Sequence, residues 1–260
     1  MQPSSPVWSA QQYTAFEDER TRPARDLVAA IPLVDVRRAV DLGCGPGNST
    51  EILAARCPEA EVHGVDTSAD MIEAARQRMP GTRFDLADIA TWAASAPYGI
   101  ILANAVLQWL PGHETLLPKL VNMLEAGGSL AVQMPDNLDE PAHRLMREVA
   151  ADGPWAEALR EAANQRASLG SAAWYYALLG PLCRRVEVWR TTYHHPLAGP
   201  AAVVEWFKGS GLRPFFAPLD APQRAAYLAA YEAKLARAYE TQPDGTVLLP
   251  FPRLFIVATR

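Results

Sequence analysis

The sequence is poor in cysteine and has no long hydrophobic run. Its three cysteines, Cys44, Cys57 and Cys183, lack metal-ligand spacing, and their odd number argues against a disulfide framework. No run approaches the roughly 18 apolar residues that a membrane-spanning helix needs. The first thirty residues are too charged and polar for a secretory signal peptide. We therefore expect no metal site and no membrane segment, and a cytoplasmic protein.

The sequence also lacks an excess of positive charge. Its 24 lysines and arginines are outnumbered by 29 aspartates and glutamates, which gives a formal net charge of -5 at pH 7. This balance argues against a general nucleic-acid binder, which would need a basic face. With 260 residues, 49% of them hydrophobic, the chain can bury a large core, as one domain or as a domain with a lid.

What the sequence does contain is a glycine-rich stretch, Val40-Asp41-Leu42-Gly43-Cys44-Gly45-Pro46-Gly47-Asn48-Ser49-Thr50. It predicts a short buried strand, a tight turn and a helix that begins near Asn48. Glycines at every second position let the backbone approach a ligand, since no Cβ atom intervenes. The helix start offers unpaired N–H groups and the positive end of a dipole. In an α/β protein such a turn holds a nucleotide-like ligand at the carboxyl ends of the strands.

The spacing of the glycines indicates which ligand. A dinucleotide fingerprint needs a third glycine where this sequence has Asn48, and Asp41 would repel a pyrophosphate. The pattern favours a cationic, zwitterionic cofactor, and it is similar to motif I of class I S-adenosylmethionine-dependent methyltransferases. The alternative is a tight strand-to-helix turn that binds nothing.

Including the strand before the glycine turn, strands are predicted at 39–42, 61–65, 82–84, 99–103 and 129–134. They alternate with helices at 49–55, 69–78 and 113–124, and the last of these helices is predicted to end at a glycine C-cap, Gly127-Gly128. This alternation predicts a parallel sheet with right-handed crossovers. Asp66, at the end of the second strand, is placed to accept hydrogen bonds from both ribose hydroxyls. Its alternative role is to cap the next helix, which Thr67 or Ser68 could do instead.

Two later loops complete the predicted cofactor site. Asp88 could accept the adenine amino group while Ile89 packs on the ring, although an exposed loop aspartate is the alternative reading. Asn104 and Trp109 follow the fourth strand and would border the reaction centre. After Met134 the pattern changes to helices at about 136–180 and 200–240, which would form a lid, with strand-like runs at 186–193, 247–249 and 253–258.

Several strings resemble the trans-aconitate 2-methyltransferase family of class I methyltransferases, and the likeness runs nearly end to end. They are Arg20-Thr21-Arg22-Pro23-Ala24, the motif I run, Asn104-Ala105 to Trp109-Leu110-Pro111, Gln133-Met134-Pro135-Asp136-Asn137, Leu145-Met146-Arg147-Glu148-Val149, Trp189-Arg190-Thr191-Thr192-Tyr193, Gly211-Leu212-Arg213-Pro214 and Phe251-Pro252-Arg253-Leu254-Phe255-Ile256-Val257.

The resemblance implies an α/β, Rossmann-like fold with a seven-stranded, mostly parallel sheet, helices on both faces and a helical lid. It implies four segments: N-terminal helices at 1–35, a cofactor-binding core at 36–135, a helical lid at 136–182, and strands at 183–260 with lid helices at 200–240 inserted. It also implies S-adenosylmethionine as cofactor, S-adenosylhomocysteine as product, and a small polycarboxylic acid as substrate. The candidate cofactor contacts are Trp8, Tyr13, Arg22, Asp41, Gly43, Gly45, Asn48, Asp66, Thr67, Met71, Asp88, Ile89, Asn104, Ala105 and Trp109.

Methylation of a carboxylate needs no general base, because a carboxylic acid of pKa about 4 is already ionised at pH 7. We therefore expect no catalytic acid or base, only orientation and cationic groups that hold the substrate. Arg190 and Arg253 lie in otherwise apolar strings, where an unpartnered charge would be costly, although any one arginine could be a surface ion-pair partner. The candidate substrate contacts are Gln133, Arg144, Arg147, Arg190, Tyr193, His194 with its neighbour His195, Arg213 and Arg253.

Three other functions remain open from the sequence. A nicotinamide-dependent oxidoreductase shares the strand-turn-helix, but Asn48 and Asp41 disfavour it. A regulatory protein could bind S-adenosylmethionine without transferring its methyl group. A methyltransferase could also act on another small molecule. The sequence does not predict an oligomeric state, and a monomer is the simplest expectation.

Overall fold

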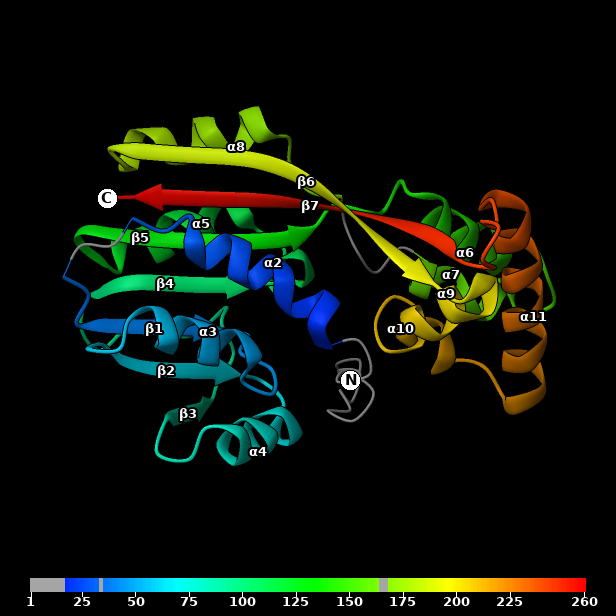
Figure 1. The fold of residues 1–260 in the computed structure, drawn as a ribbon, viewed down its shortest axis with the longest axis horizontal. Coiled ribbons are helices and arrows are strands. Elements are labelled where there is room, and N and C mark those ends of the chain that lie inside the picture. The colour runs from blue at the N-terminus through cyan, green and yellow to red at the C-terminus, as the bar shows by residue number, and fades with distance from the viewer. Residues whose placement is uncertain (1–16, 33–34, 164–167) are drawn as a thin grey trace. The chain divides into compact units, whose positions relative to one another are not determined.

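The described residues, 17–32, 35–163 and 168–260 of the computed structural model, form one sheet with flanking helices and a group of further helices (Figure 1). Side chains are described from residue 21 onwards. The strands are β1 (Arg38–Leu42), β2 (Glu61–Asp66), β3 (Arg83–Leu86), β4 (Tyr98–Asn104), β5 (Leu124–Pro135), β6 (Arg185–Leu197) and β7 (Val247–Thr259). The α-helices are α2 (Glu17–Ala29), α3 (Asn48–Arg56), α4 (Ala69–Arg78), α5 (His113–Asn122), α6 (Pro141–Ala151), α7 (Ala156–Ala163), α8 (Ala172–Leu179), α9 (Gly199–Lys208), α10 (Arg213–Phe216) and α11 (Ala221–Ala238). Two 3-10 turns are η2 (Leu107–Trp109) and η3 (Gly180–Leu182).

The sheet has seven strands in the order β3-β2-β1-β4-β5-β7-β6. The pairs β1–β2, β1–β4, β2–β3 and β4–β5 are parallel. β7 runs opposite to β5 in Figure 1, and their ends are joined by hydrogen bonds from Gly127 N to Arg260 O and from Arg260 N to Gly128 O. The predicted seven-stranded, mostly parallel sheet is confirmed.

The central strands form because their residues are apolar without interruption. A parallel sheet covered on both faces buries every side chain of its inner strands, so these strands do not alternate between apolar and polar residues. Val40, Ile101, Val132 and Ile256, from β1, β4, β5 and β7, are fully buried in one cluster. Helix α3 packs against β1 and β2, α4 against β2 and β3, and α5 against β5. No helix among the described residues is long and apolar enough to cross a membrane.

The predicted glycine C-cap at Gly127-Gly128 is wrong. Helix α5 ends at Asn122, and both glycines lie inside β5, next to a shift in its register with β4. A Cβ atom on Gly128 would come within 2.7 Å of the Tyr98 carbonyl oxygen, and Gly127 has a φ of 86°. These glycines are therefore needed for close strand pairing at an irregular position and not for a helix end.

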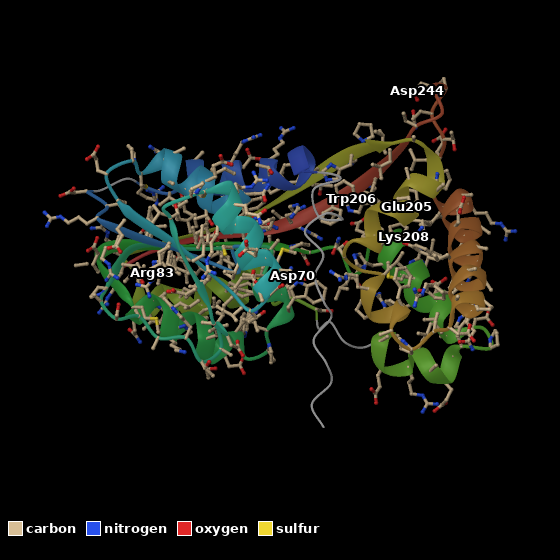
Figure 2. The ribbon with its side chains drawn as sticks, turned by 90° about the horizontal axis from the view of Figure 1, so that it is seen from below. Asp70, Arg83, Glu205, Trp206, Lys208 and Asp244 are labelled. Carbon is tan, nitrogen blue, oxygen red and sulfur yellow. The ribbon has the colours of Figure 1, made fainter. Side chains whose placement is uncertain are left out.

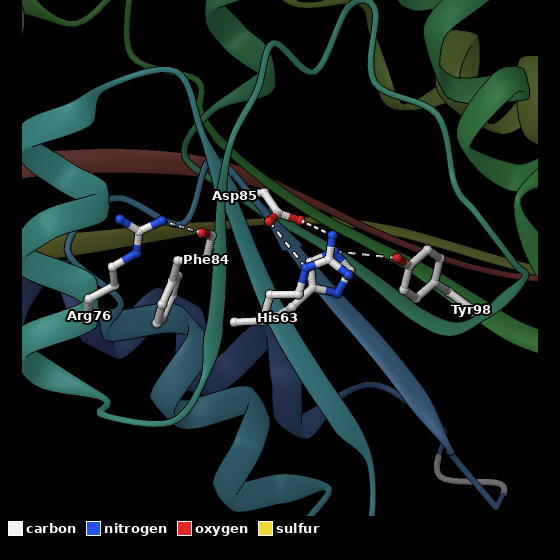
Figure 3. Close-up of polar contacts among 6 residues, drawn as sticks. His63, Arg76, Phe84, Asp85 and Tyr98 are labelled. Atoms are coloured by element: carbon white, nitrogen blue, oxygen red, sulfur yellow. Dashed lines mark hydrogen bonds and ion pairs between the residues drawn. The ribbon is translucent and has the colours of Figure 1, made fainter.

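His63 of β2 is buried within the sheet unit (Figure 3). His63 Nε2 lies 3.3 Å from the Tyr98 hydroxyl, and burial lowers the pKa of His63 from its usual range. On the neighbouring strand, Arg83 forms an ion pair with Asp85 at 2.7 Å. Arg76 of α4 donates to the Phe84 carbonyl at 2.9 Å. These contacts link β2 to β4 and α4 to β3, and one ion pair lies within β3.

The chain divides into two compact units. The sheet unit comprises the described part of Val7–Pro135 with Leu169–Thr191 and Leu254–Arg260, and the helical unit comprises Asp136–Ser168 and Thr192–Arg253. The predicted segments 136–182 and 183–260 each contribute to both units. Helix α8 groups with the sheet unit because Tyr175 and Leu179 are buried in its core.

The helical unit is held together by tyrosines on one face of α11. The Tyr231 hydroxyl donates to the Ala142 carbonyl of α6 at 3.0 Å, and the Tyr227 hydroxyl donates to the Met146 carbonyl at 2.9 Å. Just after α11, the Tyr239 hydroxyl accepts from Ala142 N at 3.0 Å. Each hydroxyl thus satisfies a backbone group of α6 in the interior of the unit.

Helix α9 has a buried aromatic side and an exposed charged side (Figure 2). Trp206 is buried, whereas Glu205 next to it is exposed and forms an ion pair with Lys208. The helix therefore places its aromatic residue in the interior and its charges outside, as an amphipathic helix does.

Candidate cofactor and substrate site

The predicted site residues gather at the carboxyl ends of neighbouring strands in the sheet unit. Asp41 is the penultimate residue of β1, Asp66 ends β2, and Asn104 ends β4, directly opposite Gln133 of β5. Because these strands are parallel, their carboxyl ends meet at one edge of the sheet, where such folds bind their ligands.

The glycine-rich turn after β1 has the predicted form. Gly43, Gly45 and Gly47 have φ values of 71°, 53° and 91°, in the left-handed region that favours glycine. A Cβ on Gly43 would come within 2.4 Å of Val106 Cγ2, so the turn after β4 packs against this turn. At Gly45 no heavy atom lies within 4 Å of the same position, so the backbone there is open to a ligand.

Asp41 is completely buried beneath this turn. Its Oδ2 accepts hydrogen bonds from Ser49 Oγ at 2.7 Å and Thr50 Oγ1 at 2.8 Å, at the start of α3. Its Oδ1 is buried without a hydrogen-bond partner. Burial raises the pKa of Asp41 to about 7, with a smaller increase from the charge of Asp66, while the two hydroxyl contacts oppose the rise.

Asp66 links the glycine-rich turn to the start of α4. Its Oδ2 accepts from Gly45 N at 2.9 Å, and its Oδ1 accepts from Ser68 N at 2.9 Å. The N-cap of α4 is Ser68, whose Oγ accepts from Met71 N at 3.4 Å. The capping role that competed for Asp66 is therefore taken by Ser68. A carboxylate has about four acceptor positions, so both oxygens of Asp66 can accept further donors.

The two cofactor candidates in the loop after β3, Asp88 and Ile89, differ in their exposure to solvent. Asp88 is exposed, and its Oδ1 accepts from Ala90 N at 2.9 Å. Ile89 is buried in the core of the sheet unit with Val65. Asp88 is thus available to a ligand, whereas the Ile89 side chain contributes to the core.

The turn after β4 contains an unusual backbone conformation. Ala105 has a φ of 55°, and its N–H donates to the Gln133 carbonyl at 2.8 Å. Its carbonyl accepts from Gln108 Nε2 at 2.7 Å. Asn104 Oδ1 and Gln108 Oε1 are both buried without a hydrogen-bond partner. Trp109, at the end of η2, is partly exposed.

The donor and acceptor set of this edge fits a cationic ligand. Asp41 Oδ1 and Asn104 Oδ1 are buried acceptors without donors, and they lie in β1 and β4, whose following turns meet where Gly43 contacts Val106. An ammonium group or a positively charged sulfur would be stabilised beside such oxygens, whereas a diphosphate would be repelled. The residues therefore fit S-adenosylmethionine. The described residues contain no group of three or more His, Cys, Asp or Glu side chains that could hold a metal ion.

The remaining cofactor candidates are less central. Trp8 and Tyr13 lie outside the described residues. Arg22 is exposed on α2, Asn48 is the first residue of α3, and Thr67 is exposed beside Asp66. Met71 is buried in the first turn of α4.

In the helical unit, one of the arginine candidates for substrate binding is buried. Arg253 on β7 is only 4% exposed, and its guanidinium lies 4.6 Å from the centre of the Phe251 ring and 5.9 Å from that of Tyr193. The Tyr193 ring is nearly parallel to that of His195, which is buried, whereas His194 is exposed. This alternation along β6 makes His195, and not His194, the histidine of the Arg253 cluster.

The other arginine candidates lie elsewhere. Arg144 is exposed and pairs with Glu148 at 3.7 Å, while Arg147 donates to the Leu138 carbonyl at 2.8 Å. Arg213 is half-buried at the start of α10, and burial lowers its pKa. Arg190 lies in an apolar string but is exposed, because β6 is the edge strand of the sheet; it belongs to the sheet unit.

Known proteins are similar to this chain over nearly its whole length. Residues 39–128 match a family model described as a methyltransferase domain. Proteins named trans-aconitate 2-methyltransferase from Rhodopseudomonas palustris strain BisB18, Methylobacterium nodulans and Paracidovorax citrulli are 58%, 57% and 54% identical to it. Each match covers 97% of this chain and 98% or more of the relative. The chain belongs to the trans-aconitate 2-methyltransferase family.

Solved structures place this trans-aconitate 2-methyltransferase family member in a wider fold group. The YcgJ protein of Bacillus subtilis is 12% identical with a TM-score of 0.59, covering 92% of this chain and 98% of that one. Coclaurine N-methyltransferase bound to N-methylheliamine and SAH is 16% identical with a TM-score of 0.55, covering 99% of this chain and 77% of that one. At such identities the likeness supports the class I methyltransferase fold alone.

Sequence reasoning missed one residue of the site, Gln108. The signal was present, because a glutamine stands within the apolar string from Ala105 to Leu110, where a polar side chain must find a partner if buried. Its hydrogen bond to the carbonyl of Ala105 depends on the positive φ of Ala105, which no sequence pattern predicts.

Proposed function

We propose that this chain is an S-adenosylmethionine-dependent carboxyl O-methyltransferase that forms the monomethyl ester of trans-aconitate or a closely related small polycarboxylic acid. The observation that carries the proposal is the match to trans-aconitate 2-methyltransferases over nearly the full length of both chains. We also propose a cytoplasmic monomer, and the excess of acidic residues supports a protein that does not bind nucleic acid.

The sheet unit would hold the cofactor through the polar ends of its strands. Asp66 would accept from the ribose hydroxyls, and Asp88 would accept from the adenine amino group. Asp41 and Asn104 would provide acceptors for the positively charged end, and the open backbone at Gly45 would allow close approach. Gly43, Asn48, Thr67, Met71, Ile89, Ala105 and Trp109 would shape the surrounding turns, with Trp8, Tyr13 and Arg22 as further contacts.

When bound, S-adenosylmethionine would supply a methyl group attached to a positively charged sulfur. A carboxylate oxygen of the substrate could attack this methyl group in line, with the sulfur as the leaving group. The substrate oxygen is already ionised at neutral pH, so no side chain has to remove a proton. The contribution of the protein is orientation, which can supply on the order of 7–11 kcal/mol of the barrier.

The helical unit would supply the positive charge that a polycarboxylate needs. A guanidinium group matches a carboxylate with two parallel hydrogen bonds, and a buried one is little screened by water. The burial of Arg253 therefore favours it as a carboxylate contact, with Tyr193 as a neighbouring donor. Gln133, Arg144, Arg147, Arg190, His194 and Arg213 remain candidates on sequence grounds.

The decisive experiment is a methyl-transfer assay with labelled S-adenosylmethionine over a panel of di- and tricarboxylic acids. We expect transfer to trans-aconitate above all other acids, with the ester position read by mass spectrometry. Calorimetry would measure cofactor binding separately. Binding without transfer to any acid would indicate a regulatory binding protein, and absence of binding with turnover of a nicotinamide would indicate an oxidoreductase.

A further inference from the structure

The backbone after β4 is strained at one residue. Among the described residues, Ala105 is the one non-glycine residue with a positive φ, 55°. The left-handed conformation costs an L-residue of this kind roughly 1–2 kcal/mol, because its Cβ approaches the following carbonyl oxygen. Such strain persists only where the surrounding contacts hold it, and it is concentrated at functional sites.

Two hydrogen bonds hold Ala105 in this conformation. Its N–H donates to the backbone carbonyl of Gln133 in β5, at 2.8 Å, and its carbonyl accepts from the side-chain amide of Gln108, at 2.7 Å. Gln108 is 8% exposed, so water cannot easily replace it at this carbonyl. Its other end, Oε1, is buried without a hydrogen-bond partner. Gln108 is therefore engaged in the structure through its donor end.

Gln108 is itself presented from a fixed support. The Leu107 carbonyl, in the same short turn η2, lies 2.9 Å from His113 Nε2, and His113 Nδ1 lies 2.8 Å from the Tyr175 hydroxyl. A carbonyl can only accept, so His113 Nε2 carries the hydrogen that it donates to the Leu107 carbonyl. Because His113 belongs to α5 and the buried Tyr175 to α8, η2 is anchored on two helices of the sheet unit.

The strained turn reaches the cofactor-binding edge on both sides. Asn104 precedes Ala105 and ends β4, and Val106 follows it and occupies the space above Gly43. A change of Ala105 to an ordinary negative φ would rotate the peptide planes on either side and displace both neighbours.

We propose that Gln108 is a positioning residue for methyl transfer. Its side-chain amide holds Ala105 in the left-handed conformation and thereby keeps Asn104 and Val106 aligned with the glycine-rich turn. This inference rests on the proposed function, and it assigns to Gln108 no contact with the reacting atoms.

The test is a double-mutant cycle between Gln108 and Ala105. Gln108→Met removes the amide donor at nearly constant volume, and we expect kcat to fall about tenfold, the population change that the strain of one left-handed alanine represents. The KM for trans-aconitate should change less than kcat. Ala105→Gly makes the positive φ inexpensive, so Gln108→Met should cost less than about threefold in that background.

Two further variants make the result specific. Gln108→Glu keeps the size and polarity of the side chain but, when ionised, has no donor for the Ala105 carbonyl, so it should show the same loss and the same rescue. Gln77→Met removes an exposed amide on α4, which contacts Glu73, and should leave kcat unchanged. Thermal unfolding of each variant shows whether it is folded.

The possible results separate this inference from the proposed function. An active wild type with equal losses in the alanine and glycine backgrounds, or with no loss for folded Gln108→Met, would overturn the role of Gln108 alone. A wild-type chain that methylates no acid would overturn the proposed function and this inference together.

Discussion

Asp41 is an acid that the fold keeps at the border of ionisation. It is fully buried at the end of β1, its pKa is raised to about 7, and one of its oxygens has no donor. The folded chain therefore holds a proton between about pH 4 and pH 7 that the unfolded chain releases. The contribution of this group to stability accordingly decreases as the pH rises through that window.

A cation bound beside Asp41 should favour its ionised form, so binding at low pH must release a proton. We predict that the affinity for S-adenosylmethionine, measured by calorimetry without substrate, rises several-fold from about pH 6 to pH 8 and then levels off. Asp41→Asn should bind more weakly and lose most of this dependence. A wild-type affinity that is constant over the same range would show that Asp41 does not face the cation.

Gly43 is required for two separable reasons, its positive φ and the closeness of Val106. We predict that Gly43→Ala lowers the free energy of unfolding clearly more than the roughly 1–2 kcal/mol expected from φ alone. Gly81→Ala is the matched control, because Gly81 also has a positive φ but has no atom within 4 Å of an added Cβ. Urea unfolding measures both, and Val106→Gly, which removes the Val106 Cβ at 2.5 Å as well as the Cγ atoms, should restore part of the loss at Gly43. Equal losses at the two glycines would remove the steric explanation.

At the scale of elements, α6 and α11 are joined by buried hydroxyl-to-carbonyl contacts. Tyr231→Phe removes the donor to Ala142 O while keeping the ring, and we predict a loss of about 1 kcal/mol in the free energy of unfolding. Tyr176→Phe, at an exposed position on α8, should change stability by less than half of that. Urea unfolding followed by circular dichroism gives both values, and a neutral Tyr231→Phe would mean that the hydroxyl contributes nothing net.

The elements that sequence reasoning predicted well are those whose signals are local. The strand, glycine turn and helix around Gly43 were found to within one or two residues, and the helix Ala69–Arg78 has the predicted bounds. The predicted helix C-cap at Gly127-Gly128 was wrong because glycine occurs equally well at a helix end and at an irregular strand pairing. Only the contact with β4, distant in sequence, decides between them.

The difference between local signals and contacts distant in sequence also decides which site residues could be predicted. The position of Asp66 could be predicted because it ends a strand whose pattern is local, and Ser68 was already named as the alternative cap. Arg190 and Arg253 could not be separated, because both lie in apolar strings and only the order of strands puts one of them at an edge. Gln108 was missed because its partner depends on the strained φ of Ala105.

At the scale of the whole molecule, the two units carry different parts of the proposed function. The cofactor candidates among the described residues lie in the sheet unit, and the buried arginine candidate lies in the helical unit. A change to one of these groups should therefore affect one ligand and not the other.

We predict that Arg253→Lys raises the KM for trans-aconitate about tenfold or more, since a lysine cannot form the paired contact with a carboxylate. The calorimetric Kd for S-adenosylmethionine should stay within about twofold. Arg237→Lys, on the exposed side of α11, is the matched control and should leave both constants unchanged. A folded Arg253→Lys variant with an unaltered KM would exclude this arginine as a substrate contact.

Strand β7 follows every other described helix and strand in the chain, yet its residues serve both units, with Phe251 and Arg253 in one and Leu254 to Thr259 between β5 and β6 in the other. During synthesis on the ribosome, β5 must therefore wait for a neighbour made more than a hundred residues later. Until that strand emerges, an apolar edge of the growing sheet stays open to mispairing, which makes the nascent chain a natural client for chaperones.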